Sequence, residues 1–92
     1  MYIILIYDIS KDKNGEKRWI NIFKICKKYL KHVQNSVFEG EITKAQLYQL
    51  KNELNKYIDK TLDSVIIIRC RQQKWIEKEF WGIENKEPDY FI

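Results

Sequence analysis

With 92 residues, of which 45% are hydrophobic and 14% aromatic, the chain has the composition of a folded globular protein and leaves no room for a disordered tail. Its length predicts one domain over residues 1–92, and a domain this small gains much from oligomerisation, so we expect a homodimer. Cys26 and Cys70 lie far apart in a chain with a single histidine, so neither a zinc site nor a disulfide framework is indicated, and buried free thiols in a reducing cytoplasm are expected. No stretch has the pattern of a targeting or membrane segment, which also indicates a cytoplasmic protein.

The net charge of +4 is concentrated in one part of the chain. Residues 11–31 contain eight basic and two acidic side chains, a local charge of +6, so the rest of the chain carries −2. A basic sector on a mildly acidic remainder predicts a surface that faces a polyanion. The basic residues that we expect to contact nucleic acid are Lys11, Lys13, Lys17, Arg18, Lys24, Lys28 and Lys31.

The first ten residues (MYIILIYDIS) join an apolar strand to a single acid. Residues 2–7 form an unbroken apolar, β-favouring run, which predicts a strand covered on both faces rather than a half-exposed one. Asp8 follows at once, so the strand would deliver one carboxylate to the end of a sheet. Asp8 is therefore a candidate for the chemistry, with an Asx turn or cap that ends the strand as the alternative.

A helix is predicted over residues 16–30, after a polar loop with a turn signal at Asn14-Gly15. One apolar stripe recurs at helical spacing: Trp19, Ile22, Phe23, Cys26 and Leu30. Lysines occupy the opposite side, either as a solvated face or as a nucleic-acid contact. Arg18 near the first turn opposes the helix dipole, so we expect it to bind a carboxylate or a phosphate.

Residues 32–42 alternate well enough for one bent strand or a very tight hairpin. His32 has no second histidine or cysteine nearby, so we expect a cation at the preceding helix end or a phosphate contact rather than a metal ligand. Ser36 lacks the surroundings of a nucleophile, and a local backbone hydrogen bond is the expected role of its side chain.

The second half of the chain predicts one more helix and one or two more strands. Thr43 and Gln46 form a capping box before a helix with apolar residues at core spacing up to Tyr57 and Ile58. Asp63 is expected to cap or turn rather than to bind metal, and residues 64–70 (SVIIIRC) form an apolar strand. Residues 86–89 predict a turn around Pro88, after which residues 90–92 are expected to dock as a strand.

This order of elements is typical of an α+β fold, the ferredoxin-like βαββαβ sandwich, here with an additional C-terminal strand. Both helices have a single apolar stripe, so they cover one face of an antiparallel sheet. A second protomer would cover the other face, and residues 71–92 would pair with the edge strand 64–70, exchanged with or packed on the partner.

Three stretches resemble one protein family. They are Tyr7-Asp8-Ile9 at the end of the first strand, residues 33–39 (VQNSVFE), and residues 63–65 (DSV) with Ile67. In order and spacing over residues 1–69 they resemble the smaller of the two CRISPR adaptation proteins, the CRISPR-associated endoribonuclease family. Ser36 and Phe38 match the SVF core of the family motif. The chain departs at Leu30, where many members have a glycine, so the first helix should end without a left-handed cap.

The resemblance implies a homodimer of ferredoxin-like domains with one Mg²⁺ or Mn²⁺ ion shared between the two copies of Asp8. It further implies a place between dimers of the larger adaptation integrase, holding the DNA fragment that becomes a new spacer, and metal-dependent nuclease activity in some members. Arg18 matches a basic position early in the first helix.

Elementary chemistry allows this site, because Mg²⁺-assisted phosphodiester hydrolysis needs only one or two carboxylates plus water to place the ion. Two functional hypotheses remain open and are compatible: an architectural DNA-binding dimer, and an endonuclease with Asp8 as metal ligand. The alternative is a stand-alone ferredoxin-like RNA-binding or toxin-type ribonuclease domain, although residues 37–39 (VFE) lack the paired aromatics of an RNA recognition motif.

Overall fold

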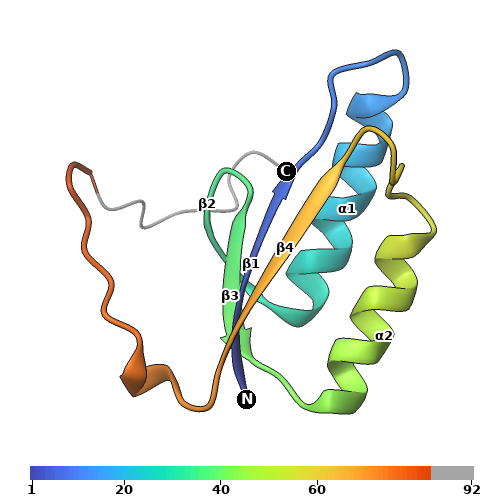
Figure 1. The fold of residues 1–92 in the computed structure, drawn as a ribbon. Coiled ribbons are helices and arrows are strands. Elements are labelled where there is room, and N and C mark those ends of the chain that lie inside the picture. The colour runs from blue at the N-terminus through green and yellow to red at the C-terminus, as the bar shows by residue number, and fades with distance from the viewer. Residues whose placement is uncertain (84–92) are drawn as a thin grey trace.

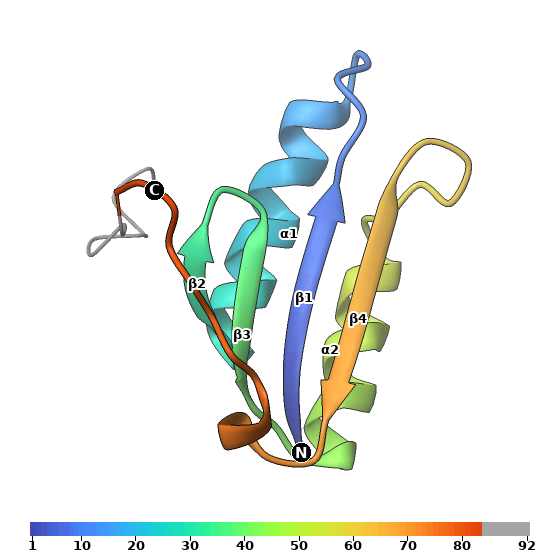
Figure 2. The same cartoon turned by 60° about the vertical axis from the view of Figure 1, so that its left-hand side comes forward.

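The computed structural model describes residues 1–83 and confirms a ferredoxin-like α+β fold (Figure 1). The elements follow one another as β1 (Tyr2–Asp8), α1 (Gly15–Tyr29), β2 (Lys31–Gln34), β3 (Val37–Glu41), α2 (Lys44–Asn55), β4 (Ser64–Cys70) and a 3₁₀ turn, η1 (Gln73–Trp75). The four strands form one sheet in the order β2-β3-β1-β4, and every neighbouring pair is antiparallel. Both helices lie on the same side of this sheet (Figure 2).

Within one chain, strand β1 is fully covered on the face toward the helices and only partly covered on the other face, the face that a second protomer is expected to cover. Ile3, Leu5 and Tyr7 point toward the helices and are at most 2% exposed, whereas Ile4 and Ile6 on the other face are only half-buried. β1 is central in the sheet, with β3 on one side and β4 on the other. Within the described chain, the open face remains partly exposed to solvent.

Helix α1 packs through the predicted stripe. Ile22, Phe23 and Cys26 are fully buried, and Trp19 stacks against Phe23 with ring centroids 5.3 Å apart. The helix ends at an extended Leu30 (φ −133°), without a left-handed cap, as expected from its missing glycine.

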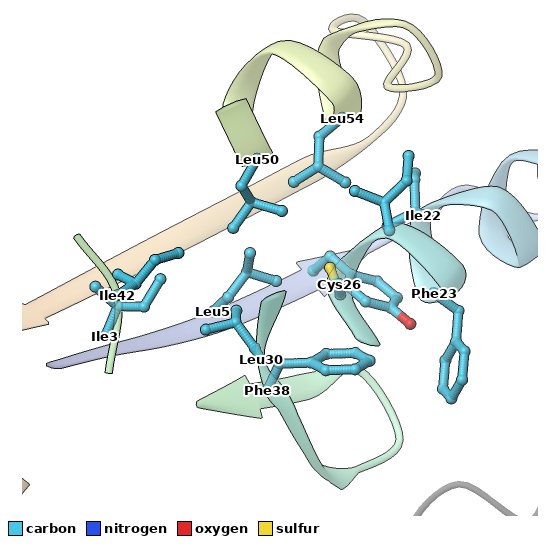
Figure 3. Packing of buried hydrophobic residues seen from close by; sticks show 12 residues of the cluster. Ile3, Leu5, Ile22, Phe23, Cys26, Leu30, Phe38, Ile42, Leu50 and Leu54 are labelled. Atoms are coloured by element: carbon cyan, nitrogen blue, oxygen red, sulfur yellow. The ribbon is translucent and has the colours of Figure 1, made fainter. Parts of the chain in front are cut away.

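The hydrophobic core lies between the sheet and the helices and contains an aromatic cluster (Figure 3). Phe38 meets Phe23 edge to face at 5.4 Å and stacks on His32 at 4.8 Å. His32 is 3% exposed and its Nε2 bonds the carbonyl oxygen of Asn35 at 2.7 Å. The expectation that His32 contacts a phosphate is therefore wrong, because its ring is buried between two phenylalanines.

Residues 32–42 form the tight hairpin, which was one of the two predicted alternatives. Asn35 turns the chain with a positive φ of 40°, a conformation that asparagine tolerates better than most residues. The ladder between β2 and β3 shifts register between His32 and Gln34. The hairpin also binds β1 directly, since the amide of Tyr7 donates to the carbonyl oxygen of Ser36 at 3.1 Å.

Helix α2 begins with the predicted capping box. The Thr43 hydroxyl accepts from the amide of Gln46 at 3.1 Å, and the Gln46 side chain accepts from the amide of Thr43 at 3.0 Å. The helix stops at Asn55, earlier than predicted, so Tyr57 lies beyond it and is 38% exposed. Ile58 still packs against the core from the following turn.

Strand β4 is an edge strand and is apolar on both faces. Val65 and Ile67 pack against the core, whereas Ile66 and Ile68 are 54% and 47% exposed on the open face. Residues 76–83 run on the open side of the sheet near β2 and β3 (Figure 2), where Lys78 pairs with Glu39. The predicted turn at Pro88 and the C-terminal strand 90–92 lie outside the described residues.

Within residues 1–83, no helix combines the length and the apolar run that crossing a bilayer requires.

Replacing Phe38 by alanine should destabilise the protein strongly, because the fully buried ring contacts Tyr7, Phe23 and His32. We expect a loss of about 3–5 kcal/mol in the free energy of unfolding, measured by urea denaturation. Phe80→Ala is the matched control, since Phe80 is 37% exposed, and it should cost much less. Equal losses for both variants would contradict the described core.

Candidate functional site

Asp8 is the last residue of β1 and is exposed. It pairs in register with Ser64 at the start of β4, so its backbone is held in the sheet while its carboxylate faces solvent. Within the described chain, the Asp8 carboxylate makes no hydrogen bond or ion pair. Figures 1 and 2 show that β1 ends where α1 begins and where the chain enters β4. The start of α1, which follows β1 closely in sequence, and the start of β4, which is far from it in sequence, therefore both lie at the end of the sheet that carries this acid.

A cavity of about 580 Å³ opens at this end of the sheet. Its lining combines side-chain oxygen atoms, lysine ammonium groups and an indole ring, which are groups able to contact a nucleotide. They come from the end of β1, the following loop, the first turns of α1 and the β2–β3 turn: Asp8, Ser10, Lys11, Asp12, Lys13, Glu16, Trp19, Asn35 and Ser36.

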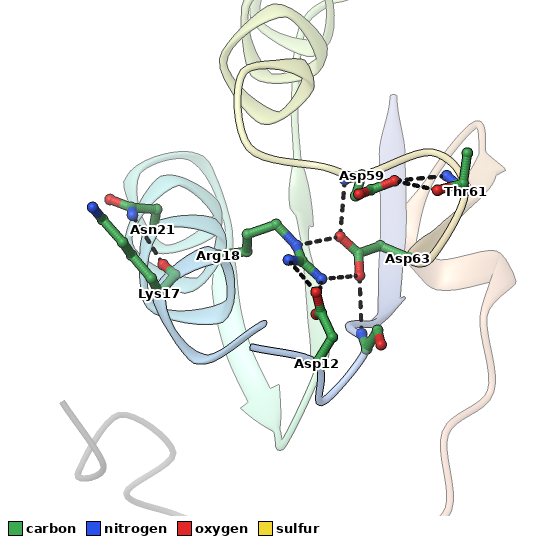
Figure 4. A network of polar contacts seen from close by, with 8 residues as sticks. Asp12, Lys17, Arg18, Asn21, Asp59, Thr61 and Asp63 are labelled. Carbon is green, nitrogen blue, oxygen red and sulfur yellow. Dashed lines mark hydrogen bonds and ion pairs between the residues drawn. The ribbon is translucent and has the colours of Figure 1, made fainter. Parts of the chain in front are cut away.

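Arg18 and Asp63 join α1 to the loop before β4 (Figure 4). Arg18 Nε donates to Asp63 Oδ2 at 2.8 Å and Arg18 Nη2 donates to Oδ1 at 3.0 Å, a bidentate pair. Arg18 Nη2 also donates to Asp12 Oδ1 at 2.7 Å. The Asp63 side chain is 0% exposed and also accepts the amides of Ser10 and Asp59, each at 2.9 Å.

These contacts explain the acidity of Asp63. The hydrogen bonds from Arg18 and from two backbone amides favour the carboxylate over the protonated acid and lower the pKa of Asp63 to about 2, although burial acts in the opposite direction. The same contacts raise the pKa of Arg18. The pair therefore stays ionised throughout the physiological pH range.

The loop after Asp8 is also confined from the side of α1. A Cβ at Gly15 would lie 1.9 Å from the carbonyl oxygen of Ser10, far closer than any side chain can approach. The absence of a side chain at Gly15 thus lets the first turn of α1 lie directly against the backbone of Ser10.

The predicted cationic residues fall into two groups. Five lysines are exposed and form no ion pair within the described chain: Lys11, Lys13, Lys17, Lys24 and Lys31. Lys28 is also exposed but pairs with Glu53, which neutralises part of its charge. Arg18 differs from all of them, because its side chain is only 13% exposed and both of its partners are carboxylates. Of the two anions expected for Arg18, the structure shows the carboxylate.

The fit of a divalent cation depends on the donors near Asp8. Residues 1–83 contain no group of three histidine, cysteine or acidic side chains that could hold a metal ion. Asp8 itself offers exposed hard oxygen donors, which suit Mg²⁺ or Mn²⁺. Asp12 lines the same cavity but already accepts from Arg18. The described residues therefore fit a site to which one chain contributes a single free carboxylate.

Two of the motif residues have structural surroundings. Phe38 is fully buried in the core, and Ser36 lines the cavity while its carbonyl oxygen binds the amide of Tyr7. Asp63 has the turn role expected for it, since it accepts the amide of Asp59 within its own loop. Its contacts with Ser10 and Arg18 were not predicted, and the only signal in the sequence was the unfavourable position of an arginine near the start of a helix.

Comparison with known proteins gives one consistent result. The family model described as CRISPR associated protein Cas2 matches residues 1–78. The CRISPR-associated endoribonuclease Cas2 of Fusobacterium nucleatum is 48% identical over 92 residues, which covers all of this chain and 87% of that protein. Its counterpart in Thermotoga maritima is 41% identical over the full length of both chains.

Solved structures agree with the sequence relatives. A crystal structure described as Cas2 superposes with a TM-score of 0.80 at 36% identity, covering 96% of this chain and 92% of that one. The crystal structure of Streptococcus pyogenes Cas2 superposes with a TM-score of 0.74 at 31% identity, covering 87% of this chain and 100% of that one. With a family match over most of its length and relatives of this similarity, the chain belongs to the Cas2 family of CRISPR-associated proteins.

Proposed function

We propose that this protein acts in CRISPR adaptation as a nucleic-acid-binding homodimer, an architectural partner of the larger integrase, with divalent-metal-dependent endonuclease activity at a site formed by Asp8 of both protomers. Family membership supports the CRISPR role, and the relatives in Fusobacterium nucleatum and Thermotoga maritima are named endoribonucleases. The observation that carries the nuclease proposal is the exposed Asp8 carboxylate, without a partner in the described chain, at the mouth of a cavity that is also lined by lysines.

A second copy of the chain is the proposed cover of the open sheet face. Ile66 and Ile68 are about half exposed there, next to the half-buried Ile4 and Ile6. A contiguous apolar surface of this kind marks an interaction site. Stacking two such faces about a two-fold axis brings the two copies of β1 together and supplies a second Asp8.

The metal would be held by the two Asp8 carboxylates and water. Bound Mg²⁺ or Mn²⁺ supplies a Lewis acid that polarises a phosphate and lowers the pKa of a bound water. A single ion can join two carboxylates whose oxygens lie within about 5 Å of each other, because each Mg–O or Mn–O contact is about 2.0–2.6 Å. Lys11 and Lys13 line the same cavity and would bind the substrate phosphates.

The exposed lysines of α1 extend this surface. Lys17 and Lys24 carry charge that no described acid neutralises, and they would bind phosphates without reading bases. The alternative of a stand-alone RNA-binding domain with an aromatic stacking platform is less well supported, because Phe38, the aromatic of the hairpin motif, is fully buried and offers no face to a base.

Asp8→Asn should abolish metal-dependent cleavage while leaving the fold and DNA binding intact, since the carboxylate is exposed and makes no contact with described residues. Cleavage of labelled RNA and DNA would be measured with Mn²⁺, with Mg²⁺ and with EDTA. Glu79→Gln, which removes another exposed acid, should retain activity. Cleavage that survives both Asp8→Asn and EDTA would argue against the metal site.

Spacer insertion separates the two roles. If the protein is architectural, Asp8→Asn should support insertion together with the integrase at the wild-type level. Loss of insertion by a folded Asp8→Asn protein would contradict a purely architectural role.

The double variant Lys17→Ala/Lys24→Ala should weaken binding to a short DNA duplex and reduce its salt dependence. Each lost phosphate contact lowers the slope of log K against log salt by about one. Fluorescence anisotropy at several salt concentrations measures this slope. The control Lys51→Ala/Lys60→Ala makes the same change in charge on α2 and the loop after it, and should leave the slope unchanged.

Ile66→Asp should convert the dimer to monomers, because it places a charge on the open face without disturbing a residue of the buried core. Light scattering or sedimentation measures the mass. Tyr48→Asp, at a 67% exposed position on α2, is the control that should leave the dimer intact. A wild-type protein that is monomeric at micromolar concentration would refute the proposed interface.

A further inference from the structure

We infer that Arg18 and Asp63 are positioning residues for Asp8: together they fix the backbone that carries the Asp8 carboxylate, and Arg18 acts through Asp63 rather than by contacting nucleic acid. The inference rests on the proposed role of Asp8 as a metal ligand. The inference gives a function to the ion pair of Arg18 and Asp63, which binding of phosphates by the exposed lysines does not need.

The contacts of Asp63 reach both sides of Asp8. Its Oδ1 accepts the amide of Ser10, two residues after Asp8, at 2.9 Å. Asp63 also directly precedes Ser64, the residue that pairs with Asp8 across the β1–β4 ladder. One buried side chain thus links the strand opposite Asp8 to the loop that follows it.

Arg18 keeps this link in place. It supplies two of the four hydrogen bonds to the Asp63 carboxylate, and it is the only cation that contacts this carboxylate within the described chain. A carboxylate that is 0% exposed needs such a partner, since an unpaired charge in a buried position is strongly destabilising. Removing Arg18 would therefore drive Asp63 toward solvent and release the amide of Ser10.

Gly15 confines Ser10 from the opposite side. The amide of Ser10 donates to Asp63. The carbonyl oxygen of Ser10 lies so close to Gly15 that a Cβ on residue 15 would be only 1.9 Å from it. The loop after Asp8 is therefore held on one side by the loop before β4 and packs on the other side against the start of α1. Two independent features of the structure restrict the same residue, which is more than the termination of a strand requires.

This restriction matters for a metal ion shared between two chains. Each carboxylate oxygen must lie within about 0.2 Å of the ideal metal–oxygen distance. In a symmetric dimer, any displacement of Asp8 occurs in both protomers and so affects both ligands. A misplacement of about 1 Å at a reacting centre can lower the rate about 100-fold. Positioning of Asp8 should therefore appear in metal affinity and turnover rather than in nucleic-acid affinity.

Asp63→Asn tests the inference, because the amide retains the shape of the side chain but removes its charge and one of its acceptor oxygens. We expect the affinity for Mn²⁺, measured by the EPR signal of the free ion, to fall about tenfold, and kcat to fall about tenfold or more, with KM for the nucleic acid nearly unchanged. Amide exchange at Ser10 should become faster. Arg18→Lys, which keeps the charge but not the bidentate geometry, should show smaller changes in the same direction.

The matched control is Asp59→Asn. Asp59 lies in the same loop, and its backbone amide, which the substitution retains, donates to Asp63. Its carboxylate accepts from Thr61 instead, at 3.0 Å from the amide and 2.6 Å from the hydroxyl, and makes no hydrogen bond with Ser10 or Arg18. The Asp59→Asn substitution makes the same change in charge as Asp63→Asn and should leave the Mn²⁺ affinity and kcat at the wild-type values.

Two results would overturn the inference, and they are distinguishable. If folded Asp63→Asn or Arg18→Lys protein melts at a lower temperature but binds Mn²⁺ and turns over like wild type, the pair only stabilises the fold. If wild type and Asp8→Asn give identical Mn²⁺ titrations, the proposed metal site itself is wrong and the inference falls with it. Should Asp63→Asn fail to fold, Arg18→Lys decides by the same criteria.

Discussion

Hydrogen bonding of β1 to a strand on each side, together with burial of its inner face, is the constraint on which the other elements depend. β3 and β4 both pair with β1, and Leu5 and Tyr7 pack among residues contributed by α1 and the hairpin. The ladder with β4 extends as far as Asp8 and Ser64. A short, very apolar strand thereby brings one charged side chain to a fixed place at the end of the sheet.

The sheet has different environments on its two faces, and this asymmetry connects the fold to the proposed assembly. Two helices cover the inner face, whereas Ile66 and Ile68 remain exposed on the outer face of the edge strand. Cas2 family membership is established by sequence and fold together. The proposed dimerisation through the outer face would bring a second carboxylate to the proposed metal site, to which one chain contributes only Asp8.

Features set by local sequence were predictable, whereas contacts between distant segments were not. The stripe of α1, the capping box at Thr43 and the placement of Asp8 at a strand end follow from spacing over a few residues. The pair of Arg18 and Asp63 joins positions 45 apart, and only the folded chain brings them together. His32 was misjudged because its polarity gives no sign of the two phenylalanine rings that enclose it.

Close contact between Gly15 and Ser10 also has a mechanical consequence. Backbone atoms of helix and loop touch there without an intervening side chain that could change rotamer and absorb a displacement. A displacement of the start of α1 toward this loop would therefore press directly on the backbone of Ser10, two residues after Asp8.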